Sequence, residues 1–160
     1  MAAMTTSPTN GAVLDTTGID WIPLEAGQAF KPISLPAVGP RQLLLRVDPD
    51  TVVGLHRHHG EVHGFNISGA RVLLDPAGHV HVSAGTYVYE PAGTVDSWMA
   101  VGDEPCVVHI SIDGPMDTLD EHGEVTASTG TPELRRIYLE WCAARGTTPA
   151  PALEGGRPDS

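Results

Sequence analysis

Basic side chains are scarce in this sequence of 160 residues. Nine lysines and arginines stand against 20 aspartates and glutamates, so the formal net charge is −11 at pH 7. A surface this acidic repels phosphate backbones and anionic lipid headgroups, which argues against nucleic acids and membrane surfaces as partners. We therefore expect the chain to bind small molecules or further copies of itself.

Cysteines are also few, and long apolar runs are missing. The two cysteines, Cys106 and Cys142, are too few for a disulfide framework, and we expect both to be reduced and buried. No run of about 18 apolar residues is present, as a membrane-spanning helix would require. The N-terminal residues have neither the basic nor the apolar region of a secretory signal. These absences predict a cytoplasmic protein.

The chain has the length of one domain. Residues 1–18 and 147–160 are rich in small and polar residues, and we expect both segments to be disordered tails. Residues 19–146 are expected to form a single domain.

The middle of the chain consists of short segments with the composition of β-strands. They are rich in Val, Ile, Thr and Tyr and are separated by Gly, Pro or Asp. Many short strands without intervening helices predict an all-β sandwich or barrel. The expected strands are residues 42–47, 51–58, 61–67, 70–74, 78–82, 86–90, 94–101 and 106–112.

One helix is expected near the end of the chain, over residues 132–145. Thr131 suits the N-cap, Pro132 suits the first helical position, and Gly146 suits a helix stop. Four apolar residues follow helical spacing and form one stripe, which we expect to pack on the barrel or on a second subunit. They are Leu134, Ile137, Tyr138 and Trp141.

Three histidines gather between residues 54 and 69. His56 and His58 are two positions apart on a predicted strand, so their side chains point to the same face. His63 follows on the next predicted strand. Imidazoles that converge in this way are typical ligands of a divalent metal, although an isolated His-x-His pair is also found on solvated surfaces.

The spacing of these residues resembles the first signature of the cupin superfamily, and residues 85–96 are similar to its second signature. Within the superfamily, residues 62–69 and 87–93 resemble the branch that contains 2,4′-dihydroxyacetophenone dioxygenase and acetylacetone-cleaving dioxygenase. The resemblance extends from about residue 21 to residue 146. It implies the cupin fold, which is a double-stranded β-helix or jelly-roll barrel, here with a C-terminal helix.

The resemblance also implies a set of metal ligands. Cupins supply two histidines and a glutamate from the first signature and one histidine from the second. In this sequence the four positions hold His56, His58, His63 and Asp96, so a carboxylate and an imidazole have exchanged places. We expect these four residues to bind one divalent transition metal, Fe(II), with Zn, Mn or Ni as alternatives. Without His63, the other three form the two-histidine, one-carboxylate triad of non-haem Fe(II) oxygenases. The open alternative is a site without metal, in which Asp96 only caps a turn.

Other residues are expected around the metal. Glu90 stands where the family carries an acidic residue, and we expect it to act in catalysis as a hydrogen-bonding partner near the metal centre. The alternative for Glu90 is a surface position at a strand end. Phe65 and Ile67 share the predicted face of His63, and Trp98 shares that of Asp96. All three are expected to form apolar walls of a substrate cavity.

The resemblance implies a metal-dependent dioxygenase, an oxidoreductase that uses O2 to cleave a carbon–carbon bond of a small diketone or hydroxyketone. One alternative is a metal-dependent isomerase, cyclase or lyase without redox chemistry, and another is a metal-free cupin that binds a small molecule. Barrels of this type commonly pair through their sheet edges, so we expect a homodimer or homotetramer.

Overall fold

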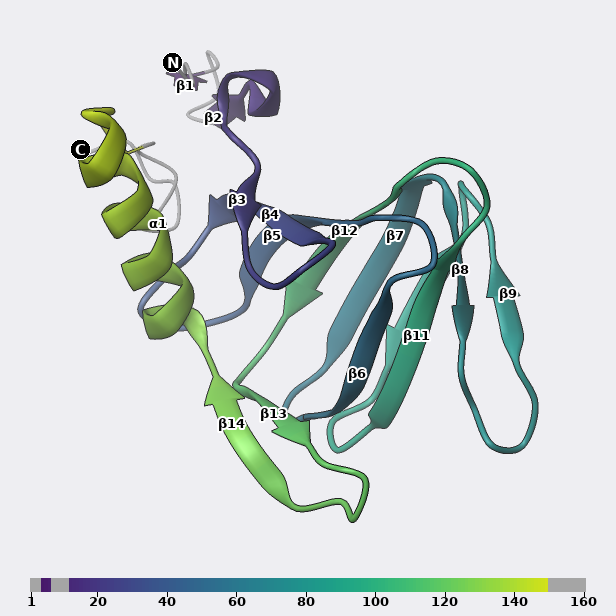
Figure 1. Ribbon diagram of the computed structural model, residues 1–160. Coiled ribbons are helices and arrows are strands. Elements are labelled where there is room, and N and C mark those ends of the chain that lie inside the picture. Colours follow the sequence, from purple (N-terminus) through teal and green to yellow (C-terminus); the bar gives the residue numbers. More distant parts are fainter. Residues whose placement is uncertain (1–3, 7–11, 150–160) are drawn as a thin grey trace.

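Two six-stranded antiparallel sheets face each other, with one helix beside them (Figure 1). The computed structural model describes residues 4–6 and 12–149. The first sheet has the order β10-β7-β12-β5-β4-β3, and the second has the order β14-β13-β6-β11-β8-β9. This arrangement confirms the all-β jelly roll with a C-terminal helix. In the first sheet the strands are β3 (Ile22–Pro23), β4 (Gln28–Ser34), β5 (Arg41–Val47), β7 (Val62–Ser68), β10 (Tyr87–Glu90) and β12 (Cys106–Ile112). In the second they are β6 (Val52–His58), β8 (Ala70–Leu73), β9 (Val80–Val82), β11 (Val95–Val101), β13 (Met116–Leu119) and β14 (Val125–Thr129).

The predicted strands correspond in order to β5 through β12, and their ends agree to within about two residues. The sequence patterns missed β3, β4, β13 and β14. In β4 the misleading residue is Pro32, at which the pairing with β5 changes register before Ser34. Strand β13 is short and half polar, so it carries no run of apolar or β-branched residues. Both missed regions matter because β4 and β13 contribute to the cavity described below.

The described part of the N-terminal segment contains regular structure where we expected disorder. Strand β1 (Met4–Thr6) pairs with β2 (Ala12–Leu14), and a short 3-10 helix, η1 (Thr16–Gly18), follows. The side chain of Asp15 caps η1 by accepting the backbone N–H of Thr17 at 2.9 Å. Residues 147–149 of the expected C-terminal tail have no regular secondary structure, and residues 1–3, 7–11 and 150–160 lie outside the described residues.

Helix α1 (Thr131–Arg145) begins one residue earlier than expected, so Gly130 rather than Thr131 is its N-cap. The reason is the carboxylate of Glu133, which accepts the backbone N–H of Gly130 at 2.7 Å and fixes the first turn. Gly146 ends the helix in the left-handed conformation, with φ 63°, as expected. Within the described residues, no helix is long and apolar enough to cross a bilayer.

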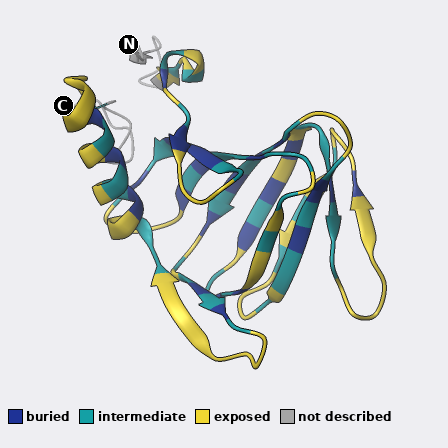
Figure 2. Ribbon diagram, viewed as in Figure 1, coloured by how far each residue is buried: buried dark blue, intermediate teal, exposed yellow. Residues whose placement is uncertain are grey.

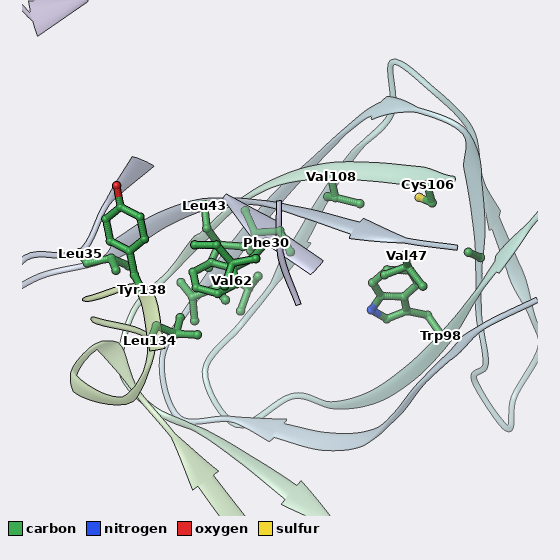
Figure 3. Packing of buried hydrophobic residues seen from close by; sticks show 14 of the residues in the cluster. Phe30, Leu35, Leu43, Val47, Val62, Trp98, Cys106, Val108, Leu134 and Tyr138 are labelled. Atoms are coloured by element: carbon green, nitrogen blue, oxygen red, sulfur yellow. The ribbon is translucent and has the colours of Figure 1, made fainter. Parts of the chain in front are cut away.

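The hydrophobic core lies between the two sheets and beneath α1 (Figures 2 and 3). Leu134 and Tyr138 of the helix are buried against the same cluster as Phe30 and Leu43 of the first sheet. The apolar stripe of α1 therefore packs on the barrel. Cys106 and Cys142 are both buried and unbridged, as predicted.

Candidate metal centre

His56, His58 and Asp96 meet on the inner face of the second sheet. Strands β6 and β11 are antiparallel neighbours, and Asp96 is the direct partner of His56 in their register. Opposed residues on adjacent strands project to the same face, and alternation along β6 adds His58 to it. One nitrogen from each imidazole and one carboxylate oxygen lie within 4.8 Å of one another. Both histidines are buried and the aspartate is half-buried.

The surroundings of His56 call for a cation beside Asp96. Its Nδ1 lies 2.7 Å from the carbonyl oxygen of Gly54, which can only accept, so Nδ1 carries a proton and donates it. Its Nε2 lies 2.6 Å from Oδ1 of Asp96, which is the separation of an ion pair that shares a proton. A metal ion that bound both side chains would take the place of this proton. Burial alone would lower the pKa of His56, but Asp96 and Gly54 outweigh burial and raise it.

His58 has the protonation state that metal binding requires. Burial, followed by the neighbouring His56, lowers the pKa of His58 to about 4, so the imidazole is neutral at pH 7. Its Nδ1 is buried and has no hydrogen-bond partner among the residues that the structure describes. Its Nε2 lies 3.9 Å from Oε2 of Glu90. A neutral imidazole with an unsatisfied buried nitrogen fits a metal ligand.

Glu90 brings a second carboxyl group to the cluster from the opposite sheet. It ends β10, where it pairs with the inward-facing Val62. Burial and a side-chain hydrogen bond with Asp96 raise the pKa of Glu90 to about 8. Burial acts in the same direction on Asp96, but hydrogen bonds from His56 and Glu90 outweigh it and lower its pKa to about 2. The two carboxyl groups therefore share a proton at pH 7, with the negative charge on Asp96.

Metal-free protein should lose stability as the pH rises from about 6.5 to about 8. Glu90 and His56 have folded-state pKa values above their ordinary values, so each stabilises the fold below its ordinary pKa and ceases to do so as the pH rises through the folded value. His58, with its lowered pKa, has the opposite effect, but only between about pH 4 and 6.5. Above that window the decline should approach about 1.4 kcal/mol per pH unit for each proton released.

Urea unfolding of metal-free protein across this pH range measures that slope. The variant Glu90→Gln cannot ionise, so its slope should be shallower by about one proton. An equal slope in the two proteins would contradict the buried protonated state of Glu90.

His63, by contrast, lies on the outer face of the first sheet, away from the cluster. The side chains of β7 alternate, with Val62 and Gly64 directed inward and His63 directed outward. The Nδ1 of His63 lies 2.6 Å from the hydroxyl oxygen of Tyr87, and its ring packs at 5.3 Å from that of Tyr89. The expectation that His63 joins the metal ligands is corrected by this geometry.

Phe65 and Ile67 share the outward face of His63, as predicted, but that face is not the cavity wall. They are 45% and 49% exposed. The inner face of β7 is instead occupied by Gly64 and the fully buried Asn66, whose Oδ1 accepts Nε–H of Arg71 at 3.1 Å. A Cβ at Gly64 would lie 3.3 Å from Nη2 of Arg71, so glycine leaves room for the guanidinium. On β7, a buried polar network therefore occupies the inner face, where apolar side chains are ordinarily found, and the large apolar side chains lie on the outer face.

A cavity of about 290 Å³ adjoins the cluster between the two sheets. Glu90 and the buried Trp98 lie on its wall beside the two histidines. Sequence reasoning missed Met116 and Thr118, which pair with His58 and His56 through β13 and so face the same space. It also missed two buried arginines, Arg41 and Arg71, and two residues of α1, Leu134 and Ile137. Only the strand register and helix docking reveal these positions.

The sequence model of the ChrR cupin-like domain matches residues 9–115, which is more than half of the chain. The chain belongs to the ChrR cupin-like family. No curated protein matches this cupin in sequence.

Solved structures share its fold. An RmlC-like cupin from Ralstonia eutropha is 22% identical, with a TM-score of 0.83, over 92% of this chain and 96% of the other. An acetylacetone dioxygenase from Acinetobacter johnsonii is 18% identical, with a TM-score of 0.67, over 86% and 91%. The anti-sigma factor ChrR, solved in complex with SigE of Rhodobacter sphaeroides, is 18% identical, with a TM-score of 0.53, over 60% and 50%. At these identities the similarity shows the cupin fold alone.

Proposed function

We propose that this cupin is a mononuclear metal-dependent dioxygenase that cleaves a carbon–carbon bond of a small diketone or hydroxyketone. The observation that carries the proposal is the convergence of His56, His58 and Asp96 on the wall of a cavity. Two histidines and one carboxylate on one side of Fe(II) leave positions for substrate and O2. The similarity in fold to the acetylacetone dioxygenase supports the substrate class.

The donor set suits Fe(II) because it combines two imidazoles with one carboxylate, and metal binding would displace the proton from Nε2 of His56. Asp96, with its lowered pKa, supplies the negative charge, and His58 is already neutral at pH 7. The hydrogen bond from Nδ1 of His56 to Gly54 orients the ring and leaves Nε2 as the ligating atom. When bound, Fe(II) would bring the substrate and O2 together and mediate the transfer to O2 of the electrons that the diketone gives up as its carbon–carbon bond is cleaved.

The remaining residues on the wall bind the substrate and move its proton. A diketone loses a proton when it binds as an enolate, and Glu90 in its ionised form can accept that proton at a carboxylate oxygen. Trp98 and Leu43 provide apolar wall, which excludes water from the reacting atoms. The cavity volume of about 290 Å³ lies at the lower end of the range for ligand pockets and so favours a small substrate.

The proposal is tested with protein purified without added metal and without a histidine tag. Elemental analysis should find about one transition-metal ion per chain, and Fe(II)-loaded protein should consume O2 when acetylacetone is added. Bound metal without oxygen consumption would favour the isomerase, cyclase or lyase alternative. Absence of metal, with no uptake of Fe(II) in vitro, would favour a metal-free binding protein.

A further inference from the structure

Arg41 is a buried arginine on the cavity wall. It is the first residue of β5, and alternation along that strand directs it to the inner face with Leu43. Only 2% of Arg41 is exposed. The cavity lies between facing sheets, so one wall carries Arg41 and the other carries His56 and His58.

The guanidinium of Arg41 lacks an anionic partner. Its Nη1 donates to the carbonyl oxygen of Gly114 at 2.5 Å, whereas its Nε has no hydrogen bond. No ion pair reaches Arg41 from the residues that the structure describes. Glu133 and Asp113 act on it only at longer range, and the carboxylate of Glu133 already accepts the N–H of Gly130. A buried guanidinium without a paired charge is costly to the fold, so such groups are retained where an anion completes them.

Arg71, the other buried arginine on the wall, is compensated within the protein. Its Nε donates to Asn66, and its guanidinium lies over the ring of Trp98 at 4.8 Å. Glu90 and Asp96 both act on it electrostatically. Among the other wall residues, the acidic Glu25 is exposed to solvent and forms no ion pair with Arg41. The uncompensated positive charge in the cavity is therefore that of Arg41.

We propose that the substrate carries a carboxylate that pairs with Arg41 while its two neighbouring oxygens face the metal ligands. The planar guanidinium fork matches a carboxylate, and the unsatisfied Nε–H supplies a donor. The inference rests on the proposed function and narrows its substrate class to anionic diketones or hydroxyketones. A neutral diketone would leave the charge of Arg41 unpaired.

The test compares three ligands by calorimetry with Fe(II)-loaded protein in the absence of O2. They are acetylacetone, 2,4-dioxopentanoate (in which a carboxylate replaces one methyl group) and the longer 4,6-dioxoheptanoate. At least one of the two carboxylates should bind about tenfold or more tightly than acetylacetone. In Arg41→Gln, which retains a donor for Gly114, that preference should disappear while the affinity for acetylacetone stays within about twofold. Equal affinities in the natural protein, or a preference that survives in Arg41→Gln, would overturn the inference.

Two further variants separate charge from structure. Arg46→Gln, on the outward side of the same strand and half exposed, should keep the full preference for the carboxylate. Arg41→Lys keeps the charge without the fork, so it should retain part of the preference for the carboxylate. This variant replaces Arg41→Gln as the test if Arg41→Gln does not fold. In that case, a folded Arg41→Lys protein that binds acetylacetone but shows no preference for the carboxylate would count against charge pairing.

Metal-free protein distinguishes failure of the inference from failure of the proposed function. If the carboxylates bind in a way that needs Arg41 but not the metal, the result would support the anion site and count against the metal-dependent reaction. If all three ligands bind equally and oxygen consumption is intact, the result would support the dioxygenase and count against the anion site. Failure of every ligand to bind in either form would overturn both.

Discussion

His56→Ala and His58→Ala should each abolish retention of the metal. Each change removes one of three side chains whose donor atoms lie within 4.8 Å of one another, and alanine provides no replacement donor. Residues that merely orient a ligand contribute about 10- to 100-fold in metal affinity, so loss of a ligand itself should cost at least about 100-fold. Elemental analysis after dialysis, and titration with Fe(II) or Zn(II), measure the loss.

His63→Ala and His59→Ala are the matched controls for these variants. His63 contacts Tyr87 and His59 contacts Asp117, both outside the cluster. Both variants should bind metal with the affinity of the natural protein. A loss of metal in His63→Ala would restore the four-ligand set that the sequence pattern predicts and contradict the outward orientation of His63.

Asp96→Asn should lose metal as severely as the histidine variants, although the two side chains have nearly the same shape. The amide that replaces the carboxylate is a neutral and weaker ligand, and the negative charge that balances the divalent ion is gone. Without the carboxylate, His56 should also lose its raised pKa, because Asp96 is the largest of the causes that raise it. Metal titration and NMR titration of the imidazole protons follow the two effects.

Asp96→His distinguishes the effect of the negative charge at position 96 from the effect of having any ligand there. It restores the histidine of the second cupin signature, so metal retention should recover relative to Asp96→Asn, while the site becomes one unit more positive than in the natural protein. If the natural site is tuned for oxygen chemistry, oxygen consumption with acetylacetone should fall or stay level in Asp96→His. A clear gain would contradict the proposed dioxygenase and favour non-redox chemistry in the natural protein.

The strands that hold the cluster could be predicted from sequence because their signals are local. Strands β5 through β12 carry short apolar, aromatic or β-branched segments between turn residues, and alternation alone places His56 and His58 on one face. The position of Asp96 beside them depends on the pairing of β6 with β11. The family resemblance implied that Asp96 belongs to the ligands, and the register of these two strands places it directly opposite His56.

The inner face of β7 could not be predicted, because polar and apolar residues have exchanged their usual sides. Gly64 and Asn66 face the interior to accommodate Arg71, whereas Phe65 and Ile67 face outward. A pattern that assigns apolar residues to the core therefore selects the wrong face. The burial of Arg41 on the cavity wall was not predicted for a similar reason, since a charged residue at the start of a strand is ordinarily exposed.

Helix α1 contributes Leu134 and Ile137 to the wall of the cavity. During synthesis, His56, His58 and Asp96 leave the ribosome before these two residues. The strands can thus bring the three ligands together before α1 has completed the wall of the cavity. Because the helix forms part of the cavity wall, a truncation before Thr131 should expose the site, and the shortened chain should exchange its ion faster than the complete chain.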